Sequence, residues 1–233
     1  MFTRYAIFYT LPPCPLADFG AAWLGWDVAR GVSVEHPKIV GIDISAITDT
    51  PRKYGLHGTI KSPFRLADGT TEQGLEIALE ALCRGLPPIV LAGLELATLG
   101  RFLALCPAGD AGPIKDVAAQ VVEQLDIFRA PYSGDELARR RSANLTPEQE
   151  VNLQTWGYPH IMNAFRFHIT LTGRLNKHLL SKVKLLLDPL IAPMLPRPFL
   201  INSLTLVGQR GDGMFEEINR HSLTQPNPIP PHL

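Results

Sequence analysis

Two short segments that lie far apart in the chain share one pattern of polar and apolar residues. They are 56–61, Leu-His-Gly-Thr-Ile-Lys, and 167–172, Phe-His-Ile-Thr-Leu-Thr. Each reads apolar, His, any residue, Thr, apolar, polar. Because successive side chains of a β-strand face opposite ways, this pattern predicts two strands with a covered apolar face and an open polar face. The fold must accommodate both.

The alternation predicts which side chains stand on each polar face. The first face consists of His57, Thr59 and Lys61, and the second consists of Arg166, His168, Thr170 and Thr172. Two polar rows, each containing a His and a Thr, are suited to acid–base chemistry on an anion.

Length and charge limit the classes of partner. The chain has 233 residues, which fits one large domain or two small lobes that share a core. Lys plus Arg equals Asp plus Glu at 22 each, so the net charge is zero. A nucleic-acid binder usually carries a basic excess that neutralises phosphates, although a local basic cleft remains compatible with this balance. A small molecule is therefore the favoured partner.

The cysteine content predicts a reducing compartment, and the N-terminus and the hydropathy predict a chain that does not span a membrane. The three cysteines are scattered, form no CxxC motif and suggest no disulfide framework. The N-terminus lacks an apolar leader with a cleavage site, and no run approaches the roughly 18 apolar residues of a membrane span. The sequence predicts a soluble, cytoplasmic chain.

Patterns of alternating and helical periodicity predict an α+β fold. Strands are expected at 4–11, 89–96, 102–105, 201–209 and 214–223, besides the His–Thr strands within 51–64 and at 165–172. Helices are expected at 16–26, 72–83, 113–128 and 177–191. A helical excursion is expected at 133–163, where Thr146 and Gln149 have the spacing of a capping box, and the proline-rich tail 226–233 is expected to be poorly ordered.

The two halves of the chain resemble each other coarsely, because each has a His–Thr strand, a helix and a hairpin. This weak repeat predicts a single bilobal domain with pseudo-symmetric lobes at 1–110 and 111–225. Hairpins outnumber βαβ crossovers, so we expect mostly antiparallel sheets that face a central cleft.

The paired motifs suit general acid–base catalysis. Imidazole titrates near neutral pH, so one histidine can be neutral while the other is protonated. Threonine hydroxyls can donate to phosphate oxygens and stabilise the charge of a transition state. No metal or cofactor is expected, since two histidines alone make a poor zinc site. The structural alternative is two histidines on amphipathic strands, each satisfied by a neighbour.

The motifs resemble those of the two-histidine phosphoesterase superfamily, bilobal α+β proteins with the LigT-like fold that act on cyclic phosphates and 2′,5′-type phosphodiesters. Further segments are similar to the DUF1045 family, which is linked to phosphonate metabolism: 4–9, 22–25, 54–66, 102–105, 126–131, 139–141, 156–159 and 165–175. This resemblance covers nearly the whole chain and implies a small phosphorylated sugar, such as a cyclic ribose phosphate, as substrate.

The predicted site contains four catalytic residues: His57, Thr59, His168 and Thr170. The predicted substrate-binding residues are Lys61, Arg166, Thr172, Tyr5, Tyr9 and Arg129. For the two tyrosines, packing inside the protein is favoured over lining the cleft, and for Arg129 binding of a second phosphate and a surface salt bridge are equal alternatives. The run 139–141 and the segment 156–159 are left open as contributors. The other histidines lack the motif, and His160 is the least certain of them.

Three functions are compatible with these sequence features. The favoured one is a metal-independent cyclic phosphodiesterase that hydrolyses a small cyclic sugar phosphate by paired histidine catalysis. The second is a phosphodiesterase for RNA with 2′,3′-cyclic or 2′,5′ phosphates, which the zero net charge disfavours. The third is a non-catalytic module that binds a phosphorylated metabolite. The sequence does not assign which histidine is the acid or the base, nor the oligomeric state.

Overall fold

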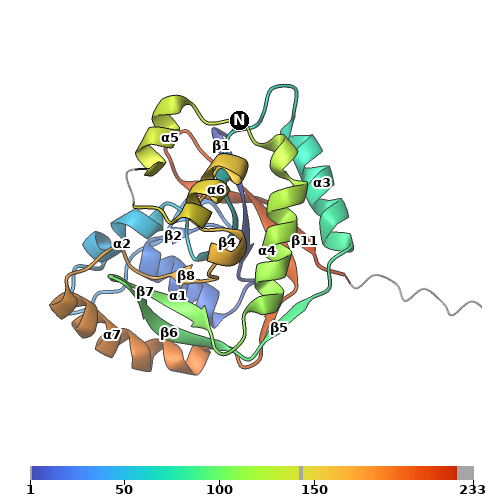
Figure 1. The fold of residues 1–233 in the computed structure, drawn as a ribbon. Helices are drawn as coiled ribbons and strands as arrows, with labels where there is room; N and C mark the ends of the chain where they lie inside the picture. Colours follow the sequence, from blue (N-terminus) through green and yellow to red (C-terminus); the bar gives the residue numbers. More distant parts are fainter. Residues whose placement is uncertain (1, 142–143, 225–233) are drawn as a thin grey trace, which may run out of the picture.

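A seven-stranded antiparallel sheet forms the centre of the protein (Figure 1). The structure is a computed structural model, and it describes residues 2–141 and 144–224. The strand order is β11-β10-β1-β4-β8-β7-β6. The bounds are β1 (Arg4–Thr10), β4 (His57–Phe64), β6 (Leu94–Leu99), β7 (Phe102–Pro107), β8 (Ile169–Thr170), β10 (Ser203–Gln209) and β11 (Phe215–Ser222). The α+β class with antiparallel pairing is thus confirmed.

Helices and two small sheets surround the central sheet (Figure 1). The helices are α1 (Pro15–Leu24), α2 (Ile44–Arg52), α3 (Glu72–Arg84), α4 (Gly112–Gln124), α5 (Gly134–Arg141), α6 (Pro147–Trp156) and α7 (Lys177–Ile191). Short 3-10 turns are η1 (Asp126–Phe128), η2 (Met162–Ala164) and η3 (Ala192–Met194). The small sheets pair β2 (Trp26–Asp27) with β3 (Val32–Ser33) and β5 (Ile89–Leu91) with β9 (Phe199–Ile201).

Local signals explain where the helices begin and end. Helix α2 was not predicted from the sequence. The Asp43 side chain caps it by accepting a hydrogen bond from Ala46 N. Helix α1 ends earlier than expected because Gly25 takes the left-handed conformation as its C-cap. The predicted capping box of α6 is present between Thr146 and Gln149. Helices α5 and α6 with η2 occupy the predicted excursion 133–163, whereas the tail 226–233 lies outside the described residues.

The strands of the two halves interleave in the central sheet. The C-terminal strands β10 and β11 lie beside β1, and the N-terminal strands β6 and β7 lie beside β8. The expected boundary near residue 110 therefore does not separate the strands, because the C-terminal hairpin pairs with the N-terminal strand. The two groups of strands meet at the pairing of β4 with β8, and these strands carry the two His–Thr motifs.

The second motif forms a shorter strand than the predicted 165–172. Phe165 still closes the η2 turn, since its N–H donates to Met162 O at 3.1 Å. Only Ile169 and Thr170 enter the ladder. Beyond them, the N–H groups of Leu171 and Thr172 both donate to Leu103 O. The short ladder is enough to fix the register of the motif.

The main hydrophobic core covers one face of β1 and β4. Ile7 and Ile60 are at most 1% exposed and pack there with leucines of α3 and valines of α4. On the opposite face Phe8 packs in a smaller buried cluster with Ala6, Val207 and Phe215. Alternation along β1 therefore gives its odd-numbered residues to the main core and its even-numbered residues to the other face.

A break in the register of β4 changes which side chains reach each face. Phe8 opposes Thr59, but the preceding residue Ile7 opposes Lys61, so β4 holds one extra residue at Ile60. Such a bulge breaks the two-residue alternation of a strand. The side chains of Ile60 and Lys61 are consequently both buried, and the polar face of β4 resumes at Ser62.

We predict that Gly58→Ala destabilises the protein, because a Cβ at this position would lie 2.4 Å from the ring of Phe167. Overpacking of this kind typically costs about 1–3 kcal/mol of unfolding free energy. Urea unfolding followed by circular dichroism measures the change. The control is Gly211→Ala, whose Cβ would meet nothing within 4 Å. Equal stability of the two variants would contradict the close packing of Phe167 over Gly58.

Candidate active site

The pairing of β4 with β8 brings the two motifs together. Gly58 lies opposite Ile169 in antiparallel register. Their neighbours are therefore cross-strand pairs, with His57 opposite Thr170 and Thr59 opposite His168, and such partners have Cβ atoms about 5 Å apart. The four predicted catalytic side chains form a compact group on one face of the sheet, which we call the His–Thr group. It has approximate two-fold symmetry about the Gly58–Ile169 pair.

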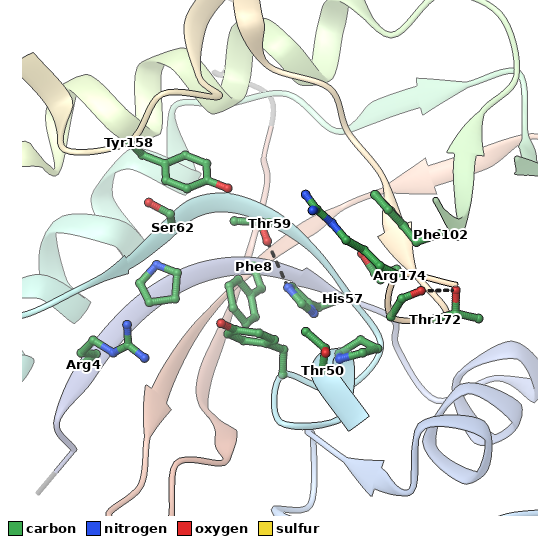
Figure 2. Close-up of a pocket in the computed structure, with 15 residues that line it drawn as sticks. Arg4, Phe8, Thr50, His57, Thr59, Ser62, Phe102, Tyr158, Thr172 and Arg174 are labelled. Atoms are coloured by element: carbon green, nitrogen blue, oxygen red, sulfur yellow. Dashed lines mark hydrogen bonds between the residues drawn. The ribbon is translucent and has the colours of Figure 1, made fainter. Parts of the chain in front are cut away.

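Hydrogen bonds fix the proton of His57. Its Nδ1 donates to Gly55 O at 2.9 Å, since a carbonyl oxygen only accepts. Its Nε2 is then the acceptor of the neutral ring and lies 3.0 Å from the Thr59 hydroxyl (Figure 2). The ring stacks on Phe8 with centroids 3.9 Å apart. His57 is thus held as a rigid neutral base whose Nε2 faces the His–Thr group.

His168 repeats this arrangement. Its Nδ1 donates to Arg166 O at 2.8 Å, again the carbonyl two residues earlier. The acceptor of the neutral ring is therefore Nε2 in both histidines. Its ring lies 5.8 Å from that of Phe102, and the side chain is half-buried. The local symmetry of the two motifs thus extends to the tautomer of each ring.

His57 is buried, whereas His168 is half-buried. Burial lowers the pKa of His57 from 6.5 to about 4, and repulsion from His168 lowers it further, whereas the bond to Gly55 O opposes this change. His57 is therefore neutral at neutral pH.

Two adjoining cavities meet at the His–Thr group. The His57 cavity, of about 380 Å³, is lined by His57, Thr170, Thr172, Tyr54, Arg4 and Arg174, among others (Figure 2). The His168 cavity, of about 900 Å³, is lined by His168, Arg166, His160, Gln149 and Asn163, among others. Both cavities are lined by Thr59, Ser62, Phe102 and Tyr158. A ligand above the His–Thr group would therefore have open space on both sides.

Positively charged side chains line the His57 cavity. Arg174 and Arg4 approach it from opposite sides in Figure 2. Arg4 is anchored through Nε to Gln209 Oε1 at 2.7 Å. The guanidinium of Arg174 has no hydrogen bond or ion pair among the described residues, and it is exposed. It is available to bind an anion.

Lys61 does not reach either cavity, contrary to the sequence prediction. The bulge at Ile60 turns it toward α4, where its Nζ donates to Val122 O and to Asp126 Oδ1, both at 3.1 Å. Its side chain is only 3% exposed. Burial lowers the pKa of Lys61 to about 8 although the Asp126 charge opposes the shift. Lys61 is a structural residue beneath the site.

Tyr5, Tyr9 and Arg129 also lie away from the two cavities. Tyr5 and Tyr9 belong to the core face of β1, and the Tyr5 hydroxyl donates to Glu72 Oε2 at 2.7 Å. Arg129 pairs with Asp126 at 2.7 Å and donates to Thr155 O at 3.1 Å. The two tyrosines therefore pack in the core, and Arg129 forms a salt bridge. The prediction that these three residues contact the substrate is wrong.

The remaining predicted residues do line the cavities. Thr172 lines the His57 cavity, but its hydroxyl accepts from Leu103 N and donates to Gly173 O, so it shapes the wall. Arg166 lines the His168 cavity and is exposed. The segment 156–159 contributes Tyr158 to both cavities. From the run 139–141, Arg141 pairs with Glu150 at 2.7 Å, and the side chains at 139 and 140 lie outside the described ones.

Several cavity residues were not predicted from the sequence: Arg4, Tyr54, Ser62, His160 and Arg174. Arg174 had a signal, because it follows the second motif directly. Ser62 could be assigned only with knowledge of the bulge. Arg4 comes from the distant strand β1, whereas Tyr54 and His160 lie in the loops that precede the two motifs, where strand alternation makes no prediction.

The described parts of the chain show neither a cluster of metal ligands nor a membrane-spanning helix. Within residues 2–141 and 144–224, no group of three or more His, Cys, Asp or Glu side chains is placed to hold a metal ion. No helix of the described chain is long and apolar enough to cross a membrane.

We predict that His57 makes stability depend on pH. The unfolded chain binds a proton on this residue near pH 6.5 and the folded chain only near pH 4. The unfolded state therefore binds more protons in this window, and stability falls as pH decreases through it, by up to about 3 kcal/mol. Urea unfolding between pH 7 and 4.5 should show a steeper loss for the native protein than for His57→Gln. Parallel losses would show that His57 is not held neutral.

Comparison with known proteins identifies relatives of the chain. Residues 59–216 match the family model DUF1045, described as a protein of unknown function. The protein named ribose 1,5-bisphosphate phosphokinase PhnN of Janthinobacterium sp. (strain Marseille) is 40% identical over 177 residues, covering 74% of this chain and 39% of the relative. Its namesake of Laribacter hongkongensis (strain HLHK9) is 31% identical over 175 residues, covering 75% of this chain and 41% of the relative.

Solved structures are similar at lower identity. The Escherichia coli LigT complex with 3′-AMP has a TM-score of 0.46 at 16% identity, covering 97% of this chain and all of that one. TT0787 of Thermus thermophilus has a TM-score of 0.41 at 16% identity, covering 95% of this chain and 98% of that one.

The sequence relatives decide the family. The family model spans most of the chain, and the chain in turn spans about two fifths of the length of the curated relatives that it matches. The predicted resemblance to this family is confirmed. The chain belongs to the DUF1045 family.

Proposed function

We propose that the chain is a metal-independent cyclic phosphodiesterase that hydrolyses a small cyclic sugar phosphate. The observation that carries the proposal is the His–Thr group, in which two histidines and two threonines share one face at the junction of two cavities. Both rings are oriented by the same kind of backbone hydrogen bond, so one can serve as a general base for attack and the other as a general acid for departure at one phosphorus atom.

His57 is the proposed general base. It is neutral at neutral pH because burial disfavours its charged form, and its Nε2 accepts. Bound substrate displaces the Thr59 hydroxyl from this nitrogen, and a water molecule takes the position. The negative charge of the phosphate raises the basicity of the ring. His57 then removes a proton from the water as the oxygen attacks phosphorus.

His168 is the proposed general acid. With Nδ1 bound to Arg166 O, its second proton is carried on Nε2 when the ring is charged. As the new bond between water oxygen and phosphorus forms, the bond from phosphorus to the sugar oxygen breaks. His168 gives its Nε2 proton to that oxygen. The products are the opened sugar hydroxyl and a phosphomonoester, and the two histidines then exchange protons with solvent.

The charge that develops on the phosphate is met by donors around the His–Thr group. The hydroxyls of Thr59 and Thr170 are placed on the same face as the histidines. Arg174 lines the adjoining His57 cavity, and its guanidinium is unpaired within the described parts of the chain. Charge-assisted hydrogen bonds of this kind stabilise the additional negative charge of the transition state.

The proposed substrate is a phosphorylated ribose or a similar sugar. The relatives carry the name of a kinase for ribose 1,5-bisphosphate, and this chain matches two fifths of them. Its sequence contains no G-x-x-x-x-G-K-S/T motif, so we assign it no phosphokinase activity. A role beside such a kinase, in phosphonate breakdown, agrees with the resemblance seen in the sequence. RNA with a 2′,3′-cyclic end is the alternative substrate.

We predict that His57→Ala and His168→Ala each lower kcat by at least about a hundredfold, because each removes one arm of acid–base catalysis. Release of phosphomonoester from ribose 2,3-cyclic phosphate, followed by ³¹P NMR, measures this, and EDTA should leave the native rate unchanged. His178→Ala, on the exposed start of α7, is the control. Near-native turnover in either active-site variant would refute the proposal, and turnover of cyclic RNA ends alone would favour the alternative.

We predict that replacing the two cations that follow the motifs, Arg174 and Lys61, has sharply different effects on catalysis. Arg174→Met should raise KM at least about tenfold, since it removes a guanidinium that binds the anion. Lys61→Met should leave kcat/KM within about threefold, because Lys61 lies beneath the site and its partner Asp126 keeps the Arg129 ion pair. The converse pattern in steady-state kinetics would restore Lys61 as a substrate contact.

A further inference from the structure

The ring of His160 is oriented by the capping box of α6. Thr146 N donates to Gln149 Oε1 at 3.0 Å, which fixes the amide so that its Nε2 faces the histidine. Gln149 Nε2 lies 3.2 Å from His160 Nδ1. An amide nitrogen only donates, so Nδ1 accepts, and the neutral His160 ring carries its proton on Nε2.

His160 therefore has the opposite tautomer to the two catalytic histidines. Their Nε2 atoms accept in the neutral form, whereas His160 Nε2 donates. His160 lines the His168 cavity, and its Nε2 has no hydrogen bond among the described residues. The fold thus places a pre-oriented donor in the cavity on the side of the proposed general acid.

Arg166 adds a positive charge to the same cavity. Its carbonyl oxygen holds His168, while its exposed guanidinium has no hydrogen bond or ion pair within the described parts of the chain. Asn163 on the lining binds Lys115 Nζ at 3.0 Å, which brings a second cation to the rim. Arg166 and Glu148 are the charged side chains on this lining, and their charges balance. The His168 cavity is therefore polar, with an unpaired guanidinium on its lining, as far as the described residues show, and a second cation at its rim.

The direction of the proposed reaction places the sugar in this cavity. His168 protonates the departing sugar oxygen, so the sugar lies toward His168 and away from the attacking water at His57. We infer that the His168 cavity is a second anion subsite, in which His160 and Arg166 bind a phosphomonoester that the same sugar carries. This inference rests on the proposed function and specifies its substrate as a sugar with both a cyclic phosphate and a second phosphate.

The test compares two substrates that differ only in the second anion: ribose 2,3-cyclic phosphate with a free 5-hydroxyl or with a 5-phosphate. The native protein should show a kcat/KM at least about tenfold higher for the 5-phosphorylated compound. The double variant His160→Phe with Arg166→Met should lose this preference to within about twofold, because its kcat/KM falls more for the 5-phosphorylated compound than for the 5-hydroxyl compound. Arg166→Met keeps the carbonyl that holds His168.

The control is the double variant His178→Phe with Arg30→Met, whose exposed positions line neither cavity. It should keep the full preference. The subsite is overturned if the native protein treats the two substrates alike, or if the His160 and Arg166 variant retains the preference. Hydrolysis of both compounds without discrimination would leave the proposed function intact.

A binding measurement separates the two proposals if neither compound is hydrolysed. The proposed function then fails, and titration calorimetry with ribose 5-phosphate examines the subsite alone. A Kd at least about fivefold weaker in the double variant than in the native protein supports the subsite. Equal affinities, or no binding by the native protein, overturn it.

Discussion

The pairing of Gly58 with Ile169 is the contact on which the candidate site depends. It joins the two groups of strands in the central sheet and sets the His–Thr motifs directly opposite each other. Since strand side chains alternate, a slip of one residue would turn one motif to the other face. Phe167 packs over Gly58 on the core face, where a Cβ would clash. The same short ladder therefore packs Phe167 into the core and aligns the side chains of the His–Thr group.

Environment makes two matched motifs unequal. Each histidine donates from Nδ1 to the carbonyl two residues earlier, so the local geometry is nearly symmetric. His57, however, is enclosed by Phe8, Tyr54 and the strand, and its pKa is lowered by burial. This asymmetry supports a direction for the proposed reaction, with the base at the His57 cavity and the acid at the His168 cavity, which spacing in the sequence could not supply.

Alternation of side chains predicted much of this site, and its failures have local causes. It placed His57 and Thr59 on one face because β4 is regular as far as Thr59, and it placed Thr170 of β8 on the same face. It failed at Lys61 because the bulge at Ile60 reverses the pattern, and a bulge has no mark in this sequence. Tyr5 and Tyr9 point to the same face of β1 as Ile7. Only the pairing of β1 with β4 shows that this face is the one covered by the main core. His160 lines the His168 cavity because the segment 133–163 folds back over the sheet, and local sequence patterns do not predict such tertiary placement.

A crystal structure with bound vanadate would test the central claim most directly. Vanadate adopts the five-coordinate geometry of phosphoryl transfer, so it reports which side chains face the apical oxygens. The account predicts one apical oxygen at about 2.7–3.2 Å from His57 Nε2 and the other at the same distance from His168 Nε2. Vanadate bound elsewhere, or held with either histidine directed away from it, would contradict a shared catalytic role for the two motifs.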